Sequence, residues 1–196
     1  GRSAGRLILA LVLLAGCGRG RDDRASTLRI NLGNEPPTLD WSLATDSTSF
    51  VVIMNIMEGL AEFDEELNPR PNMALKWDVS PDGQRYLFHL RPDAVWTDGR
   101  PVTADDYVYA WRRLLDPGTG SEYAYFLFDV EGAEDFNAGK NKDPESVGIR
   151  AISSTQLEVR LRKPVVFFPS LVTFPATFPL RRDVVERFGD RWTEPG

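Results

Sequence analysis

Within residues 81–118 a strand signal and a helix signal follow each other, each after a tight turn, and this order restricts the chain to a mixed α/β fold. A Pro-Asp-Gly turn precedes an alternating stretch that places three apolar side chains on one strand face: Tyr86, Phe88 and Leu90. A helix follows the Asp-Gly turn at 98–99, with Thr103 as its cap and an Asp-Pro-Gly stop at 116–118. Its apolar face consists of Tyr107, Trp111, Leu114 and Leu115.

Weaker patterns extend this α/β reading to the rest of the chain. Residues 28–33 alternate like a half-buried strand, and residues 147–164 predict a hairpin with Leu157, Val159 and Leu161 inward. A helix is expected from Ser47 or Ser49 to a stop at Gly59, with core packing for Met54 and Met57. Three Phe-Pro pairs divide residues 163–180, so we expect a short buried helix at 165–172 rather than a membrane span. A last short helix would pack on Val184, Val185 and Phe188.

The residues that usually carry catalysis or bind metals are sparse here. His89 is the only histidine and sits on a predicted strand face, and no nucleophile motif accompanies it. The acidic run 64–66 lacks the spaced ligands of a calcium loop, so we interpret it as a solvated turn. Asp105 and Asp106 fit the first turn of a helix, where negative charge is favoured. We therefore predict no catalytic residue, no metal site and no cofactor.

The charge distribution argues against nucleic-acid binding. The formal net charge is −6, while residues 1–24 contain five arginines against two aspartates. The remainder of the chain is therefore strongly acidic and would repel a phosphate backbone.

Residues 1–17 have the three-part layout of a secretory signal. Arg2 and Arg6 precede the apolar run 7–14, and small residues lead to Cys17, the only cysteine. The pattern Leu-Ala-Gly-Cys resembles the lipobox of bacterial lipoproteins, which implies cleavage before Cys17 and acylation of it. Two or three acyl chains hold a protein on a membrane durably. We expect residues 1–16 to be a signal peptide and residues 17–26 a flexible tether.

Several stretches together resemble the peptide/nickel class of extracytoplasmic solute-binding proteins of ABC importers. The matching stretches include EPPTLD, NIMEGLAEFD, EYAYF, GIRAISSTQLEVRLRKPVVFF and the long central run from PNMALKWDV to AWRRLLDP. They occur in family order over nearly all of residues 28–196. One departure is Trp41, close to the expected ligand cleft, where the family often has proline.

The resemblance implies a two-lobed α/β periplasmic-binding-protein-like fold, of the class with an extra lobe, of which only the N-terminal part is present. Residues 27–58 and the returning end 181–196 would belong to the first lobe, and residues 59–180 would form the second. Family contacts carried over by alignment fall on Thr45, Asp46, Ser47 and Tyr123. The other interpretation of these residues is a helix-capping loop and ordinary aromatic packing.

The function implied is capture of oligopeptides outside the cytoplasm and their delivery to an ABC permease, by a lipid-anchored protein that is expected to be a monomer. One alternative keeps the family but changes the ligand to a nickel chelate, haem or another small solute. A secreted glycosidase using paired acids is weaker, because Asp105 and Asp106 are adjacent on a helix and point in different directions. An acyl-anchored scaffold without a ligand is weaker still.

Overall fold

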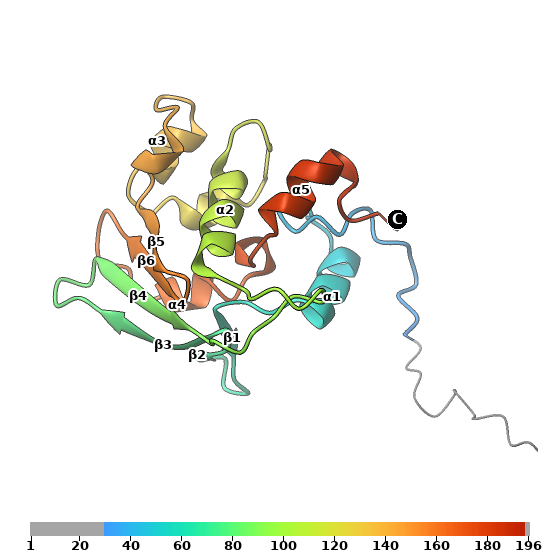
Figure 1. Ribbon diagram of the computed structural model, residues 1–196, viewed down its shortest axis with the longest axis horizontal. Coiled ribbons are helices and arrows are strands. Elements are labelled where there is room, and N and C mark those ends of the chain that lie inside the picture. The colour runs from blue at the N-terminus through green and yellow to red at the C-terminus, as the bar shows by residue number, and fades with distance from the viewer. Residues whose placement is uncertain (1–29, 195–196) are drawn as a thin grey trace, which may run out of the picture. The chain divides into compact units, whose positions relative to one another are not determined.

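The computed structural model describes residues 30–194, and the chain from Asn34 onward forms one compact unit. Figure 1 shows this unit as a small sheet with helices on one side. Cys17 and the leader lie outside the described residues, so the predictions made for them stay predictions. None of the helices within residues 30–194 is both long enough and apolar enough to cross a membrane.

The centre of the unit is a four-stranded antiparallel sheet with the strand order β3-β4-β6-β5. The strands are β3 (Ala74–Val79), β4 (Arg85–Leu90), β5 (Ile149–Ser153) and β6 (Gln156–Arg160). Phe88 in β4 lies opposite Trp77 on one side and Leu157 on the other, which sets the register across the sheet. The predicted strand around Phe88 and the predicted hairpin with Leu157 inward are both confirmed.

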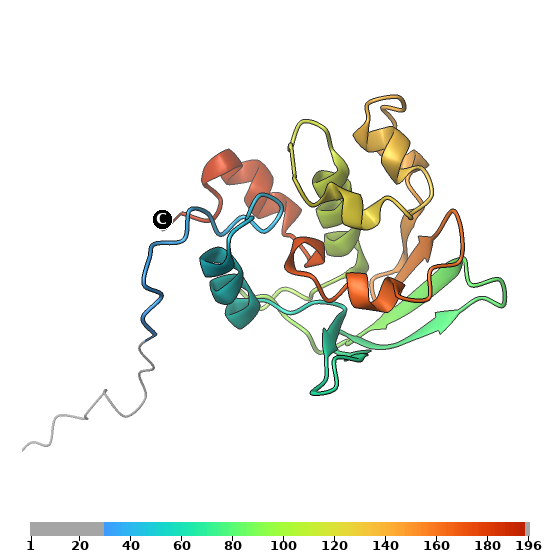
Figure 2. The same cartoon turned by 180° about the vertical axis from the view of Figure 1, so that it is seen from behind.

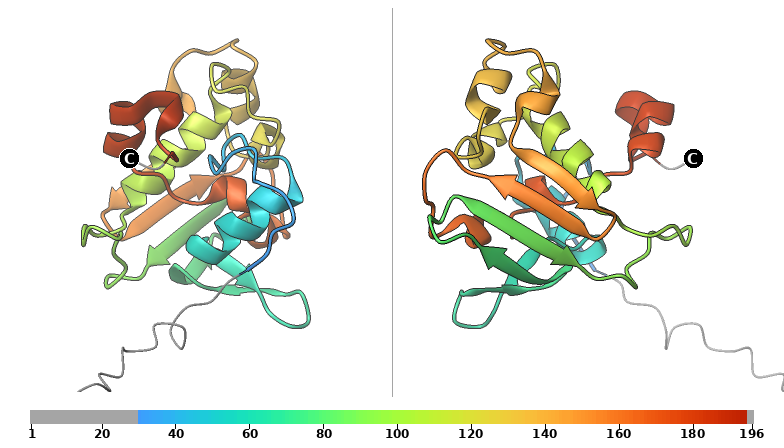
Figure 3. Two further views of the ribbon diagram at one scale, coloured as in Figure 1. Left: turned by 90° about the vertical axis from the view of Figure 1, so that its right-hand side faces the viewer. Right: turned by 60° about the vertical axis from the view of Figure 1, so that its left-hand side comes forward.

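Helix α2 (Ala104–Leu115) covers one face of this sheet, as Figure 3 shows. Its buried side chains include Tyr107, Trp111 and Leu114, and Phe88 and Phe168 lie in the same core. The predicted cap is present: Asp106 Oδ2 accepts hydrogen bonds from the backbone N–H and the hydroxyl of Thr103, at 2.8 and 3.1 Å. Both the predicted cap and the predicted apolar face are present, so the local sequence is sufficient to predict this helix.

The remaining elements are short. Helix α1 (Ser47–Ile56) precedes the hairpin of β1 (Ala61–Phe63) and β2 (Pro69–Pro71), and α3 (Ala133–Asn137) follows α2. Helices α4 (Phe168–Leu171) and α5 (Arg182–Phe188) come last, and 3-10 turns occur at Ala124–Leu127, Pro144–Ser146, Pro175–Thr177 and Gly189–Arg191. The prolines of the Phe-Pro pairs keep α4 to four residues, so the predicted buried helix forms but is shorter.

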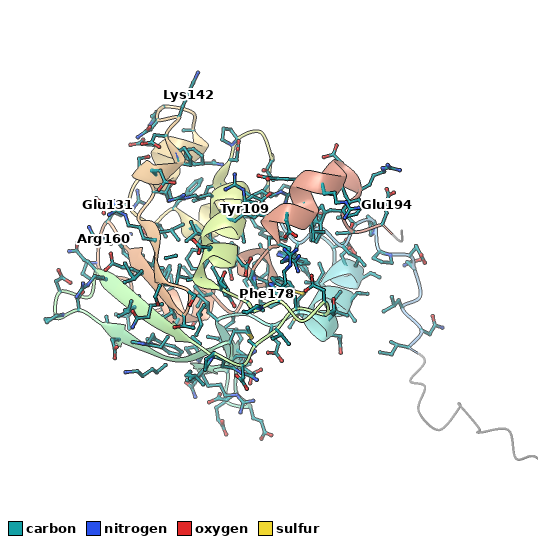
Figure 4. The ribbon with its side chains drawn as sticks, viewed as in Figure 1. Tyr109, Glu131, Lys142, Arg160, Phe178 and Glu194 are labelled. Carbon is teal, nitrogen blue, oxygen red and sulfur yellow. The ribbon has the colours of Figure 1, made fainter. Side chains whose placement is uncertain are left out.

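Two indole N–H groups donate hydrogen bonds to the backbone just after the Phe-Pro pair at 174–175. Trp111 Nε1 donates to the carbonyl oxygen of Thr177 at 2.7 Å, and Trp41 Nε1 donates to that of Phe178 at 3.2 Å. Figure 4 shows Phe178 below α2. Consecutive carbonyls that would otherwise be buried without partners are thus satisfied by tryptophans from two distant segments.

Two sequence-based expectations about residues 30–57 are wrong. Residues 30–33 form no strand, and Ile30 is 59% exposed. Met54 is 61% exposed rather than in the core, while Met57 is half-buried. The acidic run 64–66 is an exposed turn, as predicted, and it joins the two strands of a hairpin, in which Leu67 adopts a positive φ of 64°. An alternating pattern such as that of residues 30–33 forms a strand only where a neighbouring strand accepts its backbone hydrogen bonds. Strands as short as β1 and β2 are difficult to recognise in a sequence rich in turn-forming residues.

The last helix departs from expectation in its packing. Val185 is buried, but Phe188, which was expected on the apolar face, is 50% exposed. Its ring lies under the guanidinium of Arg187, with Cζ 4.9 Å from the ring centroid. A cation over an aromatic face contributes a modest attraction at an exposed site, so this ring has a partner without being buried.

Candidate functional site

The N-terminus of α1 is fixed by Asp46, which caps the helix in place of the predicted Ser47 or Ser49. Asp46 Oδ1 accepts the backbone N–H of Ser49 at 2.9 Å, and Oδ2 accepts the Ser49 hydroxyl at 2.6 Å. These hydrogen bonds, the side-chain one first, lower the pKa of the Asp46 carboxyl. The cap holds the preceding loop in one conformation and leaves Thr45 and Ser47 exposed.

The backbone of this loop has unused hydrogen-bonding capacity. Within the part of the chain that the structure describes, the backbone N–H groups of Thr45 and Ser47 have no hydrogen-bond acceptor, and that of Asp46 interacts only with its own carboxylate. A helix N-terminus carries a partial positive charge and favours acceptors such as carbonyl or carboxylate oxygens. This stretch is therefore suited to main-chain pairing with an extended ligand.

Tyr123 is half-buried and precedes the 3-10 turn Ala124–Leu127. Its ring centroid lies 4.8 Å from that of Phe174, 5.7 Å from that of Phe126 and 5.8 Å from that of Phe50. Phe50 belongs to the first turn of α1, so it connects Tyr123 to the loop at 45–47. The structure thus places the four predicted site residues in one region, around an aromatic cluster of Phe50, Tyr123, Tyr125, Phe126 and Phe174.

Sequence reasoning named Tyr125 and Phe126 as ordinary packing neighbours of Tyr123, and both contacts are present, but it did not single out Phe50 or Phe174 as members of this region. The signal available was the Phe-Pro pair at 174–175, which forces a turn and places the ring of Phe174 outside a regular element. Phe126 and Phe174 stack with centroids 4.5 Å apart and an interplanar angle of 10°. These half-buried stacked rings offer a flat apolar surface, which Phe50, 5.2 Å from Phe174 between ring centroids, connects to α1.

Trp41 does not line this region, although the sequence placed it near the ligand cleft. Its side chain is buried, packs edge-on against Trp192 with centroids 4.9 Å apart, and donates to Phe178. The residue that replaces the family's usual proline is therefore part of the packing between chain segments.

The other candidate residues have structural roles. His89 Nε2 lies 2.6 Å from Asp78 Oδ2 on the polar face of the sheet, and this hydrogen bond lowers the pKa of Asp78. Asp105 is exposed, whereas Asp106 accepts from Thr103 and from Trp96 Nε1. Within residues 30–194, no group of three or more His, Cys, Asp or Glu side chains is placed to hold a metal ion.

A cavity of about 600 Å³ lies elsewhere, between α2, α5 and the loop after α3. Figure 4 labels two of its lining residues, Tyr109 and Lys142. The arginines in its wall are neutralised: Arg112 binds Glu145, Arg113 binds Asp40, and Arg182 binds Glu186. Its electrostatics therefore give no reason to assign an anion to it.

Comparison with solved structures identifies the class of protein. The substrate-binding domain of an oligopeptide ABC transporter from Bacillus anthracis superimposes with a TM-score of 0.78 at 42% identity, over 80% of this chain and 30% of the other. Haemophilus influenzae OppA in complex with the peptide RPPGFSPFR gives a TM-score of 0.79 at 38% identity, over 84% and 32% of the two chains. The fold is that of the OppA-like periplasmic binding proteins, of which the chain covers a part.

The family follows from the sequence match. Residues 68–195 match the family described as bacterial extracellular solute-binding proteins, family 5 Middle, and the chain belongs to this family. A dipeptide-binding protein of Bacillus subtilis is 39% identical over 88% of this chain, and a periplasmic oligopeptide-binding protein of Escherichia coli is 39% identical over 87%. A probable deoxycholate-binding periplasmic protein of Escherichia coli is 36% identical over 85%.

The matched relatives are named as binding proteins and not as enzymes, which supports a solute-binding role for this chain. The chain spans about a third of the length of the curated relatives it matches, at 31% to 32% of each.

Proposed function

We propose that these residues are part of a protein that captures oligopeptides outside the cytoplasm and delivers them to the permease of an ABC importer. The observation that carries this proposal is the match to family 5 solute-binding proteins together with the peptide-bound structural relative. The free N–H groups at the start of α1, next to an aromatic surface, support it with a suitable chemistry.

The binding mechanism follows from that chemistry. An extended peptide pairs through its own carbonyl and N–H groups with the backbone at 45–47, as an added strand would. Each such hydrogen bond contributes about 1 kcal/mol net and is independent of side-chain identity. The ring or hydroxyl of Tyr123 lines the same cleft, where half-buried aromatic rings accept apolar parts of the ligand.

Release and delivery depend on two lobes that close over the ligand. The first lobe comprises residues 27–58 and 181–196, and the second comprises residues 59–180. A ligand that contacts both lobes stabilises the closed state, which the permease then recognises. No bond of the peptide is made or broken, so the protein binds without turnover.

The lipid anchor belongs to the same proposal. Residues 1–16 act as the signal peptide, Cys17 carries the acyl chains, and residues 17–26 tether a monomeric binding protein to the outer side of the cell membrane. The anchor keeps the captured peptide near the permease and so raises its effective concentration there.

Native mass spectrometry of the complete gene product tests the peptide assignment. We expect mass additions that correspond to a mixture of short peptides and that disappear after partial unfolding and refolding. An adduct of constant mass, as from a bile acid, a metal chelate or haem, would replace the peptide assignment with another solute of the same family. Turnover of a bound compound would overturn the binding role itself.

A further inference from the structure

The segments that form the aromatic cluster carry very little charge. Residues 164–180 contain no charged side chain, and residues 41–57 and 117–128 contain one each, Asp46 and Glu122. Over the whole chain, by contrast, 27% of the residues are charged. Charged residues are depleted and aromatic residues enriched at the centre of binding surfaces, so this depletion fits a surface that faces a ligand.

The fold brings these three segments together. Figure 2 shows the turn 175–177 between α1 and the turn 124–127. The stacked rings of Phe126 and Phe174 continue into Tyr125, whose centroid lies 4.9 Å from that of Phe126. Because Tyr125 is 58% exposed, the aromatic surface is open at this end, where a side chain of a bound peptide has access.

On the α1 side the charge comes from the carboxylate of Asp46. Hydrogen bonds from Ser49, the side-chain one first, lower the pKa of this carboxyl, so it is negatively charged at neutral pH. Its charge offsets the partial positive charge at the start of the helix. The N–H groups of Thr45 and Ser47 therefore suit an uncharged peptide carbonyl better than a ligand carboxylate, which would meet a like charge.

The other carboxylate is that of Glu122, which directly precedes Tyr123 and is exposed. The ring of Tyr123 packs against Phe50 and Phe174, with centroids 5.8 and 4.8 Å away, so the backbone places Glu122 beside the aromatic cluster. An acidic side chain of a ligand would meet a second like charge here.

The basic residues that border the uncharged stretch 164–180 are already paired. Arg162 Nε and Lys163 Nζ lie 3.4 and 3.2 Å from Asp129 Oδ1. Within the described part of the chain, the three segments of the aromatic cluster therefore present two carboxylates and no basic side chain to a ligand.

We propose that this region selects peptides by charge: it accepts an apolar or basic side chain over the Phe126–Phe174 stack and disfavours an acidic one. The proposal rests on the proposed peptide-binding function and names the class of peptide. An acidic side chain would lose water against the rings without gaining a partner and would be repelled by Asp46 and Glu122. A basic side chain is attracted both by the carboxylates and by the ring faces.

Calorimetric titration of the complete gene product with tetra-alanine peptides tests the proposal. One alanine at a time is replaced by glutamate, glutamine, phenylalanine or lysine, since glutamine matches glutamate in shape without its charge. We expect one position at which the glutamate peptide binds about fivefold more weakly than the glutamine peptide, while the phenylalanine and lysine peptides bind at least as tightly as the glutamine one. Added salt should reduce this glutamate-to-glutamine ratio, because exposed charges are screened.

Glu122→Gln is the variant that assigns the effect to this region. It should reduce the ratio to about twofold, since one of the two carboxylates remains. Glu131→Gln is the matched control, because it is the same change at an exposed position that Figure 4 shows near Arg160 and away from α1. The control should retain the full ratio.

Equal binding of the glutamate and glutamine peptides at every position would overturn the proposal and leave the peptide-binding function standing. The same ratio in Glu122→Gln and Glu131→Gln would overturn it too, because the discrimination would then not come from this region. Failure of every peptide to bind would instead contradict the proposed function, and this inference with it.

Discussion

Asp40 and Arg113 form a bidentate ion pair, with Oδ2 and Nη2 at 2.6 Å and Oδ1 and Nη1 at 3.0 Å. Asp40 is only 4% exposed, and its Oδ2 also accepts the indole N–H of Trp192 at 3.0 Å. The backbone N–H of Ser42 donates to Oδ1 at 3.0 Å. One carboxylate thus joins the loop before α1, the end of α2 and the segment after α5.

Removing one partner of a buried pair leaves the other charge uncompensated, which is more costly than losing the attraction alone. We predict that Asp40→Asn lowers the free energy of unfolding by about 3 kcal/mol in a denaturant titration of the complete gene product. Asp135→Asn is the matched control, because Asp135 pairs with Lys140 where both side chains are exposed. Equal effects of the two substitutions would contradict the structural role of Asp40.

Two buried tyrosines are predicted to differ in how loss of the hydroxyl changes the free energy of unfolding. The hydroxyl of Tyr86 donates to the carbonyl oxygen of Val165 at 2.9 Å, whereas the buried hydroxyl of Tyr107 has no partner among the described residues. Tyr86→Phe should lower the unfolding free energy by about 1 kcal/mol, because it removes one of the two hydrogen bonds that the Val165 carbonyl oxygen accepts, the other coming from the backbone N–H of Phe168. Tyr107→Phe should leave it unchanged or raise it, since an unpaired buried hydroxyl is removed.

Thermal or denaturant unfolding of the two variants side by side checks this pair. A loss of stability in Tyr107→Phe comparable to that in Tyr86→Phe would show that the Tyr107 hydroxyl has a partner in the complete protein.

The pH dependence of stability should differ in sign between Asp106 and Asp183. Burial raises the pKa of Asp106 above its ordinary value, despite the hydrogen bonds from Thr103. The folded state then binds more protons than the unfolded state, so this group's contribution falls as pH rises through the raised pKa. Hydrogen bonding from Arg181 lowers the pKa of Asp183, so its contribution is present above the unfolded pKa and is lost as pH falls.

Unfolding free energies at pH 4 and pH 7 test these signs. Relative to the wild type, Asp106→Asn should be less stabilised by acidification, and Asp183→Asn should be less destabilised by it. The Asp183 effect is the smaller of the two, because that side chain is 49% exposed. Shifts of the same sign in both variants would contradict the assignment.

The lipid anchor makes a separate prediction. Cys17→Ser removes the thiol that would carry the acyl chains, so the protein should move from the membrane fraction to the soluble extracytoplasmic fraction. Arg21→Ser, in the proposed tether, is the control and should stay membrane-bound. Unchanged membrane retention of Cys17→Ser would remove the anchor from the proposal.

The sequence determined those elements whose local signals agree with each other. Around Phe88 the alternation and the preceding turn give the strand, and in α2 the Thr103 cap and the Trp111 face give the helix. Strand β3 was missed, because its pattern over Ala74–Val79 is interrupted by a register shift between Ala74 and Lys76. A bulge breaks the twofold period on which a strand assignment depends.

The candidate site was only partly accessible to sequence reasoning. Thr45, Asp46, Ser47 and Tyr123 came from the family resemblance, and their ligand contacts stay a prediction. The proximity of Phe50 and Phe174 to Tyr123 arises from long-range packing that no local pattern encodes. The same holds for the burial of Asp40, whose partner Arg113 lies 73 residues away.

The central claim is that the protein binds a peptide through hydrogen bonds to the backbone of the peptide and does not change it chemically. Calorimetric titration of the complete gene product with a short peptide, and with the same peptide methylated at one central backbone nitrogen, tests this most directly. We predict that unmethylated peptides of different sequence bind within about tenfold of each other and that the methylated form binds at least tenfold more weakly. Equal affinity for the methylated peptide, or no binding of any peptide, would contradict the account.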